Sequence, residues 1–241
     1  MSVLVVSQPM VFPWVGLFEQ VRLADTYVHY DDVQLPQGRS FMTRVQVKTP
    51  QGINWLTIPI CRRDKTLIRD IQTDESQAWR NRHLKTLHHC YSKAPFFEEM
   101  YALVQTVYRE PCDLLYEFNI AGIEAVAAYF GFKPDFLLSS KLGTTTHSTQ
   151  KLVDLALRLE AKRYITGLGA LNYLEYDKFE EVNVMVEYMK YEKIPYPQLN
   201  GLFTPFVSIL DLIANCGKDG IQYIRSRSIY WKDLLDKMQT T

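Results

Sequence analysis

Two adjacent acidic residues, Asp31 and Asp32, follow a short apolar segment at residues 27–30 and are the first candidates for chemistry. Paired carboxylates raise each other's pKa, so one of them can act as a general base, or the pair can hold a divalent cation. The structural alternative is that one carboxylate caps the next turn while the other is solvated. Ser7 is the third candidate for a catalytic role, although spacing alone places no base partner beside its hydroxyl group.

Three cationic residues, Arg39, Arg44 and Lys48, are candidates for binding phosphate or carboxylate. Arginine binds such groups with two parallel hydrogen bonds, and Arg44 and Lys48 fall on the same side of a predicted strand. Trp14 and Trp55 are candidates for stacking on a base or a sugar. Exposed hairpin cations are often only solvated, and a tryptophan near a helix start is often part of the core. The functional interpretation of these residues predicts a small, anionic, nucleotide-type ligand.

Other candidates come from a rule about open parallel sheets, in which ligands bind outside the carboxyl ends of the strands. The polar residues that follow predicted strands are Gln8, Gln34, Ser139, Ser140, Thr166 and Gly167. We expect Gln8, Asp31, Gln34, Ser140 and Thr166 to line one cleft, because strand ends of this kind open onto the same edge of a sheet.

The elements that must position these residues alternate between strand and helix. Residues 3–7, 14–24 and 27–30 predict a β-α-β unit. Further strands are expected at residues 136–138, 163–166 and 182–191. The pattern predicts an α/β fold with a Rossmann-like, mostly parallel sheet, in one domain spanning residues 1–241. A β-hairpin insertion is expected at about 41–60, a helical insertion at about 76–132, and two closing helices at 205–215 and 220–235.

Composition limits the class of protein and its partners. The chain has 27 Lys plus Arg and 27 Asp plus Glu, so no net charge draws it to nucleic acid or to an anionic membrane. Its four cysteines are widely spaced and form no CxxC pair, and the apolar start is too short for a signal peptide or a membrane span. We therefore expect a cytoplasmic protein with no resident structural metal. Signatures for dinucleotide-binding, Walker-type, zinc-protease and serine-hydrolase sites are missing.

The chain resembles the WbqC-like protein family of bacteria along nearly its whole length. The matching stretches include SQP at 7–9, FPWVGLFE at 12–19, AD at 24–25, DDVQ at 31–34, RSF at 39–41, VKTPQG at 47–52, WLTIP at 55–59, SS at 139–140, TG at 166–167, NYL at 172–174, YPQ at 196–198, PFVSILDL at 205–212 and NCG at 215–217. Each stretch is weak alone, but their order and spacing together are specific. Tyr173 and Gln198 join the candidate ligand-binding residues through these matches.

The resemblance implies a role in gene clusters for O-antigen and other surface polysaccharides. The expected function is a transferase that attaches an acyl or aminoacyl group, glycyl being one suggestion, to an amino sugar carried on a nucleotide. The family usually has His before Gln-Pro where this chain has Ser7. If that imidazole is the family's general base, Asp31 and Asp32 are the obvious substitutes.

Two alternatives stay open. The Gln-Pro turn between strand and helix is similar to the nucleotide-binding turn of nucleotidyl-transferring enzymes, which would activate a carboxylate before transfer. A non-catalytic protein that binds nucleotide sugars, or a scaffold, would have kept the pocket and lost the base at Ser7. The sequence leaves the donor, the acceptor, any cofactor beyond a nucleotide-type ligand, and the oligomeric state open.

Overall fold

A six-stranded sheet forms the centre of the molecule. The computed structural model describes residues 2–36, 38, 40–61, 65–225 and 227–239. The strands, in their order across the sheet, are β10 (Ser228–Tyr230), β9 (Met185–Met189), β8 (Arg163–Thr166), β1 (Val3–Ser7), β2 (Thr26–His29) and β7 (Asp135–Leu138). All neighbouring pairs are parallel except β9 and β10. The predicted α/β fold with a mostly parallel sheet is confirmed.

The order of the strands reverses beside β1. The chain runs from β1 to β2 and on to β7 in one direction, and then returns to β8 on the opposite side of β1. Helices cover both faces, so Val3, Leu4, Val5 and Val6 are all buried, as a continuous apolar strand requires. The gap between β1 and β8 at their carboxyl ends is therefore the switch point of this sheet.

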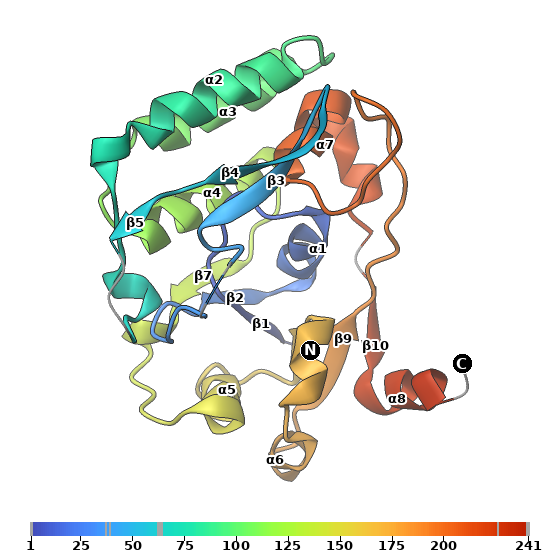
Figure 1. Cartoon of the computed structure of the whole chain (residues 1–241). Coiled ribbons are helices and arrows are strands. Elements are labelled where there is room, and N and C mark those ends of the chain that lie inside the picture. Colours follow the sequence, from blue (N-terminus) through green and yellow to red (C-terminus); the bar gives the residue numbers. More distant parts are fainter. Residues whose placement is uncertain (1, 37, 39, 62–64, 226, 240–241) are drawn as a thin grey trace.

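Two layers of helices cover the sheet, and the alternation of side chains along β1 separates them (Figure 1). Val3 and Val5 belong to the larger core, whereas Leu4 and Val6 belong to the smaller core on the other face. The larger core includes residues of α1 (Val15–Leu23), α2 (Trp79–Tyr91), α3 (Phe97–Arg109), α4 (Leu115–Phe130) and α7 (Ile209–Cys216). The smaller core includes residues of α5 (Ser148–Arg158), α6 (Tyr176–Glu181) and α8 (Trp231–Gln239).

The predicted hairpin lies over the larger core as β3 (Arg44–Thr49) and β4 (Gly52–Thr57). A short second ladder pairs β5 (Ile60–Cys61) with β6 (Gln72–Thr73). Five 3₁₀ turns complete the described elements: η1 (Ile68–Asp70), η2 (Glu75–Gln77), η3 (Ser139–Lys141), η4 (Leu168–Asn172) and η5 (Gly217–Tyr223).

The prediction of one helix at residues 220–235 is wrong. The chain there forms the end of η5, then β10, and only then α8. β10 pairs with β9, and a partly buried ion pair supports this edge of the sheet, because Arg163 Nε donates to Glu187 Oε1 at 2.8 Å and Ser228 Oγ donates to the same carboxylate. These contacts join residues far apart in the sequence, so local periodicity does not show them.

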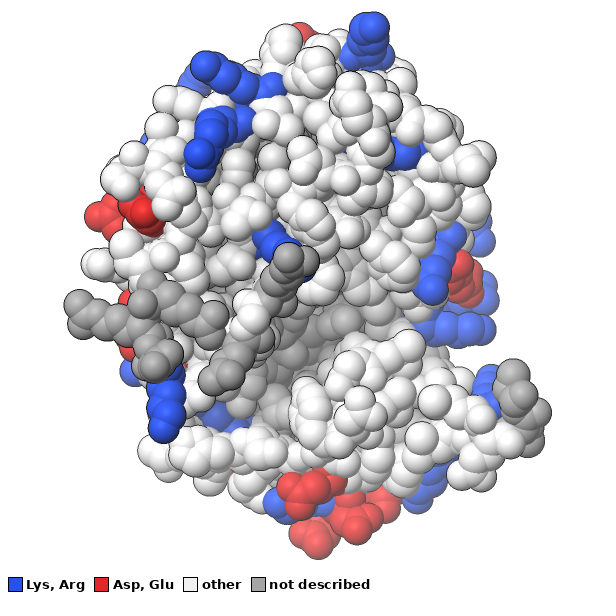
Figure 2. Space-filling view, in the orientation of Figure 1, with Lys and Arg blue, Asp and Glu red and all other residues white. Residues whose placement is uncertain are grey.

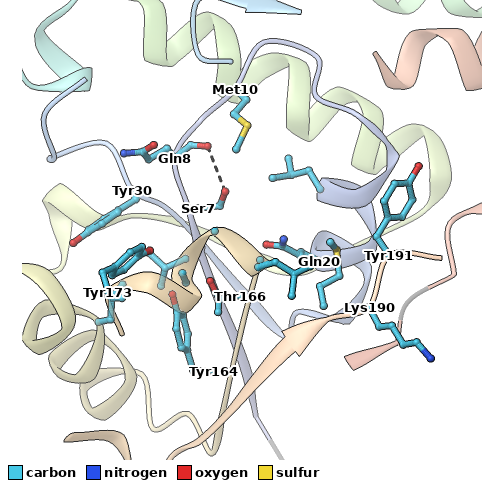
Figure 3. A pocket seen from close by; sticks show the side chains of 18 of the residues that line it. Ser7, Gln8, Met10, Gln20, Tyr30, Tyr164, Thr166, Tyr173, Lys190 and Tyr191 are labelled. Atoms are coloured by element: carbon cyan, nitrogen blue, oxygen red, sulfur yellow. Dashed lines mark hydrogen bonds between the residues drawn. The ribbon is translucent and has the colours of Figure 1, made fainter. Parts of the chain in front are cut away.

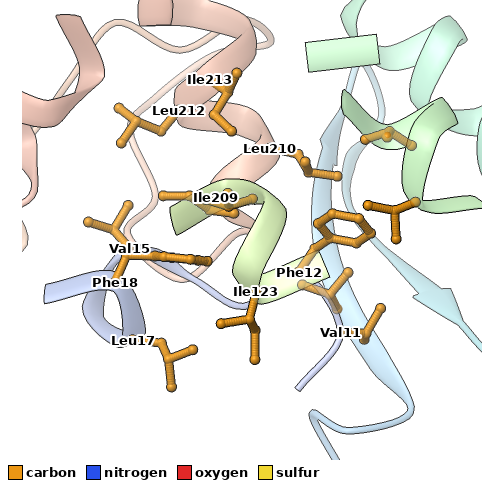
Figure 4. Close-up of a cluster of buried hydrophobic side chains, with 14 of the residues drawn as sticks. Val11, Phe12, Val15, Leu17, Phe18, Ile123, Ile209, Leu210, Leu212 and Ile213 are labelled. Atoms are coloured by element: carbon orange, nitrogen blue, oxygen red, sulfur yellow. The ribbon is translucent and has the colours of Figure 1, made fainter. Parts of the chain in front are cut away.

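The segment that links β1 to α1 is fixed by the packing of α1, α4 and α7 (Figure 4). Phe12 and Phe18 are fully buried there with Ile209 of α7. Ser208 Oγ donates to the carbonyl of Phe12, and the amide of Ile209 donates to the carbonyl of Pro13. This core holds the start of α1 at the switch point. Across the described residues, every helix is too short or too polar to cross a bilayer.

Candidate functional site

A cavity of about 910 Å³ lies at the switch point of the sheet (Figure 3). Ser7 and Gln8 border it at the end of β1, Thr166 and Gly167 at the end of β8, and Met189 at the end of β9. Its volume falls within the range of about 300–1,000 Å³ that is usual for small-molecule pockets. The space-filling view shows a hollow near the centre of the face in view, and the surface around it is mostly uncharged (Figure 2). The cavity thus lies where the strand-end rule predicts a ligand site.

Aromatic side chains form two walls of the cavity. Trp14 contacts Tyr191 and Phe206 edge-to-face, with ring centroids 4.8 Å and 5.7 Å apart. Tyr30 and Tyr173 lie together on the opposite side (Figure 3). Aromatic walls of this kind suit a planar base or the apolar face of a sugar.

Gly16 is required for the first of these walls. A Cβ atom at position 16 would lie 2.0 Å from Cζ3 of Trp14, so the indole occupies space that only glycine leaves open. The pairing of Trp14 with Gly16 in the sequence is therefore explained by geometry, since Gly16 lets the indole ring lie against the first turn of α1.

The charged groups at the cavity are all basic. Lys190 and Lys193 line it and are exposed, and the Lys193 ammonium lies 5.1 Å from the centre of the Phe206 ring. Among the described residues that line the cavity, none is Asp or Glu. The amino terminus of α1 adds partial positive charge, because Trp14 precedes the helix without a side-chain cap. This electrostatic environment favours an anion and disfavours a cation.

The two candidate acids do not line this cavity, and both are held by groups of neighbouring elements. Asp31 is buried, and its Oδ1 accepts a hydrogen bond of 3.0 Å from the amide of Ser140. Asp32 pairs with the buried Lys151 at 2.7 Å, and Lys151 lies 5.2 Å from the centre of the Tyr30 ring. Burial, with the nearby Asp32 carboxylate, raises the pKa of Tyr30 to about 12. Asp31 joins the loops after β2 and β7, and Asp32 joins the first of these loops to α5.

Lys48 occupies a different environment from the one its spacing predicts. Its ammonium does not face a shared anion with Arg44 but donates to Gln198 Oε1 at 3.0 Å, and to the carbonyls of Gly201 at 3.0 Å and Leu202 at 2.6 Å. Three acceptors saturate a lysine, so this side chain holds the 198–202 loop against the hairpin. Arg44 lies 3.9 Å from the centre of the Trp55 ring on the same hairpin.

The predicted cleft is therefore formed only in part. Of the candidate residues, those that line the cavity are Ser7, Gln8, Trp14, Thr166, Gly167 and Tyr173, and those that do not are Asp31, Asp32, Gln34, Arg44, Lys48, Trp55, Ser139, Ser140 and Gln198. Arg39 lies outside the described residues. Four of these residues follow strands on the far side of β1 from β8. Ser139 and Ser140 follow β7, and Asp31 and Gln34 follow β2.

Several lining residues are absent from the sequence-based set, notably Gln20, Tyr30, Lys190, Tyr191, Lys193 and Phe206. Lys190 follows β9 directly, so the strand-end rule selects it once the end of that strand is known. Gln20 is one turn inside α1 and Phe206 lies in a long connection. Only the folded structure brings these two to the cavity.

Comparison with known proteins supports the sequence resemblance. The model of the WbqC-like protein family matches residues 8–223. The chain is 29% identical over 229 residues to the uncharacterized protein Rv1507c of Mycobacterium tuberculosis (strain ATCC 25618 / H37Rv), an alignment that covers 93% of this chain and 98% of that protein. No solved structure matches the chain. On the extent of the family match, the chain belongs to the WbqC-like protein family.

Proposed function

We propose that this protein is a transferase that attaches an acyl or aminoacyl group to a nucleotide-linked amino sugar in surface-polysaccharide biosynthesis. The observation that supports this best is the cavity at the switch point, with aromatic walls, a basic rim and no acidic residue among its described lining. Its ligand is a small anion with planar and polyhydroxylated parts. The four cysteines are free thiols, which fits a reaction in the cytoplasm.

The arrangement of the cavity suggests where each part of such a substrate binds. The diphosphate lies at the rim, near Lys190, Lys193 and the start of α1. The base packs against the Trp14 wall. The sugar then reaches the strand ends, where Ser7 and Thr166 offer hydroxyl groups and Gln8 an amide.

The charge of the cavity also helps the chemistry. An amine attacks a carbonyl carbon only when it is unprotonated, and a basic environment lowers the pKa of an amine that binds there. Lys193 at the lining, together with the lack of a carboxylate among the described lining residues, thus favours the reactive form. In this proposal the amine needs no imidazole at position 7, while Asp31 and Asp32 stabilise the loops they join.

A second candidate is a nucleotidyl-transfer reaction that activates a carboxylate. The direct passage from β1 through a Pro-containing turn into α1 favours it, since the helix start can bind a nucleotide phosphate. ATP would then be the nucleotide, whereas the first proposal requires a nucleotide sugar. A non-catalytic binding protein would take the same ligand and release no product.

Calorimetric titration with UDP- and dTDP-linked glucosamine and with ATP separates these candidates. The transferase proposal expects the nucleotide amino sugars to bind, and mass spectrometry of mixtures with acyl-CoA or amino acids to find an acylated sugar. Gln8→Ala should weaken binding, whereas Gln222→Ala, at an exposed glutamine of η5, should not. Binding of ATP alone favours carboxylate activation, and binding without any product favours the scaffold.

A further inference from the structure

We infer that the transferred group is an uncharged acyl group and not an aminoacyl group. The inference rests on the proposed transferase function and narrows its donor. An aminoacyl group such as glycyl carries an ammonium, which loses solvation in a cavity and needs a carboxylate or several carbonyl groups to compensate. The lining of the cavity decides whether such partners exist.

The charged lining residues are unfavourable for an ammonium. Lys193, beside the Phe206 ring of the lining, repels it, whereas the Lys190 side chain points away from the cavity (Figure 3), and the described lining contains no Asp or Glu. An ammonium can also bind over an aromatic face. Two of the aromatic side chains that line the cavity already have a cation nearby, since Lys193 lies 5.1 Å from the centre of the Phe206 ring and Lys151 lies 5.2 Å from that of Tyr30.

Carboxylates in the surrounding elements are already engaged by other groups. Asp32 pairs with Lys151, and Asp31 accepts from the amide of Ser140. Glu19 of α1 is buried and accepts from the amide of Arg225 at 3.1 Å. Burial raises the pKa of Glu19 to about 8, so this group is mostly uncharged at neutral pH. None of these three side chains lines the cavity.

The apolar part of the lining suits an acyl chain. Alkyl and thioether side chains reach the cavity from both layers of the fold and from the sheet, namely Val6, Met10, Leu17, Leu152, Met189 and Ile229. Burial of each methylene of an acyl group against such side chains contributes about 0.8 kcal/mol. A methyl group gains from this surface, and an ammonium of similar size does not.

The transfer balances with a thioester as the donor class. The neutral amine nitrogen attacks the thioester carbonyl carbon, the C–N bond forms, and the C–S bond breaks. The sulfur leaves with the electron pair of that bond, and the thiol takes up the proton that the nitrogen loses. The products are an amide on the sugar and a free thiol, and no oxidant or reductant is required.

A pair of product analogues tests the inference without knowledge of the natural donor. UDP- and dTDP-linked glucosamine are acylated on nitrogen with either a propionyl or a glycyl group, which differ only in a terminal methyl against a terminal ammonium. Calorimetry at neutral pH should give a dissociation constant about tenfold lower for the propionyl compound, the effect of one unpaired charge in a site. Equal affinities, or tighter binding of the glycyl compound, would overturn the inference.

A single variant checks that the cause is the missing carboxylate. Gln20 lines the cavity, and Gln20→Glu introduces an acid of nearly the same shape. This variant should lose or reverse the preference for the propionyl compound, and Gln222→Glu should keep it. If Gln20→Glu retained the full preference, charge would not be its cause. If neither parent amino sugar bound to the wild-type protein, the proposed function itself would fail, whereas parent binding with a glycyl preference would overturn the donor class alone.

Discussion

The switch-point cavity and the Lys48 network use similar side chains for opposite purposes. The Lys48 network consists of Lys48, Gln198, Asp211 and the carbonyl groups of Gly201 and Leu202. Lys48 and Asp211 are buried, and the ammonium has three acceptors. At the cavity, Lys190 and Lys193 are exposed and line an open space. Several polar side chains lie in the stretches that match the family. Such a side chain is therefore a candidate for ligand binding only where the fold leaves it without an internal partner.

The largest expected effect comes from breaking the Lys48 network. Lys48→Met leaves Gln198 Oε1 and two carbonyl groups without this donor, and it leaves Asp211 without a nearby cation. A hydrogen bond to a charged group contributes about 1.5–3 kcal/mol, so the loss of these three should lower the free energy of urea unfolding by about 3–5 kcal/mol. Lys190→Met, at an exposed lysine, should leave the free energy of unfolding nearly unchanged. Similar small losses in both variants would remove the distinction between the two regions.

The next effect concerns Asp211. Burial raises the pKa of this carboxyl group to about 6. Because this value exceeds the ordinary 3.8, the folded protein holds a proton that the unfolded chain releases between these pH values. The free energy of unfolding should then fall by up to about 3 kcal/mol as pH rises from about 4 to 6, and level off above 6. Asp211→Asn should flatten this part of the curve, measured by urea unfolding at several pH values, and Asp219→Asn should not. Identical slopes in Asp211→Asn and the wild-type protein would contradict the prediction.

A smaller effect separates the two tryptophans as binding surfaces. Trp14→Ala removes one wall of the cavity, so the affinity for a nucleotide amino sugar should fall by about 2 kcal/mol, or roughly thirtyfold. Trp55 stacks with Arg44 on the hairpin, and Trp55→Ala should change the affinity little. Calorimetry with UDP-linked glucosamine measures both. A greater loss in Trp55→Ala would move the binding site to the hairpin.

The smallest effect tests the packing of Trp14 without deleting it. Gly16→Ala places a Cβ atom in the space of the indole ring and should push the ring out of its position. We expect binding to weaken by about 1 kcal/mol, because the wall remains but is displaced. Gly169→Ala is the matched control, since it also borders the cavity and its Cβ atom would contact nothing within 4 Å. Equal affinities of the two variants would show that the ring position does not matter.

Sequence patterns predicted the local parts of this fold well. The apolar run of β1, the Pro-containing turn and the start of α1 are short-range features, whereas the switch point depends on the strand order, which only the folded sheet shows. The edge strand β10 pairs with β9, and its Ser228 donates to Glu187 of β9. The hydrophobic periodicity of residues 220–235 does not predict this pairing, because the partners of β10 are distant in the sequence.

The candidate site was predicted only in part for a similar reason. The spacing of Arg44 and Lys48 correctly implies one side of a strand, but it cannot show that the 198–202 loop covers Lys48. Asp31 and Asp32 end a strand as a ligand site requires, but their partners come from Ser140 and Lys151, more than a hundred residues away. Whether a polar residue is satisfied internally is a tertiary property.

Photo-crosslinking tests most directly whether the cavity is the binding site. A 5-azidouridine diphosphate-linked glucosamine is irradiated with the protein, and the labelled peptides are identified by mass spectrometry with and without excess unmodified ligand. We expect the unmodified ligand to protect peptides that carry Trp14, Tyr191 and Phe206 from labelling, and we expect this labelling to be lost in Trp14→Ala. Labelling confined to β3 and β4 of the hairpin would contradict it.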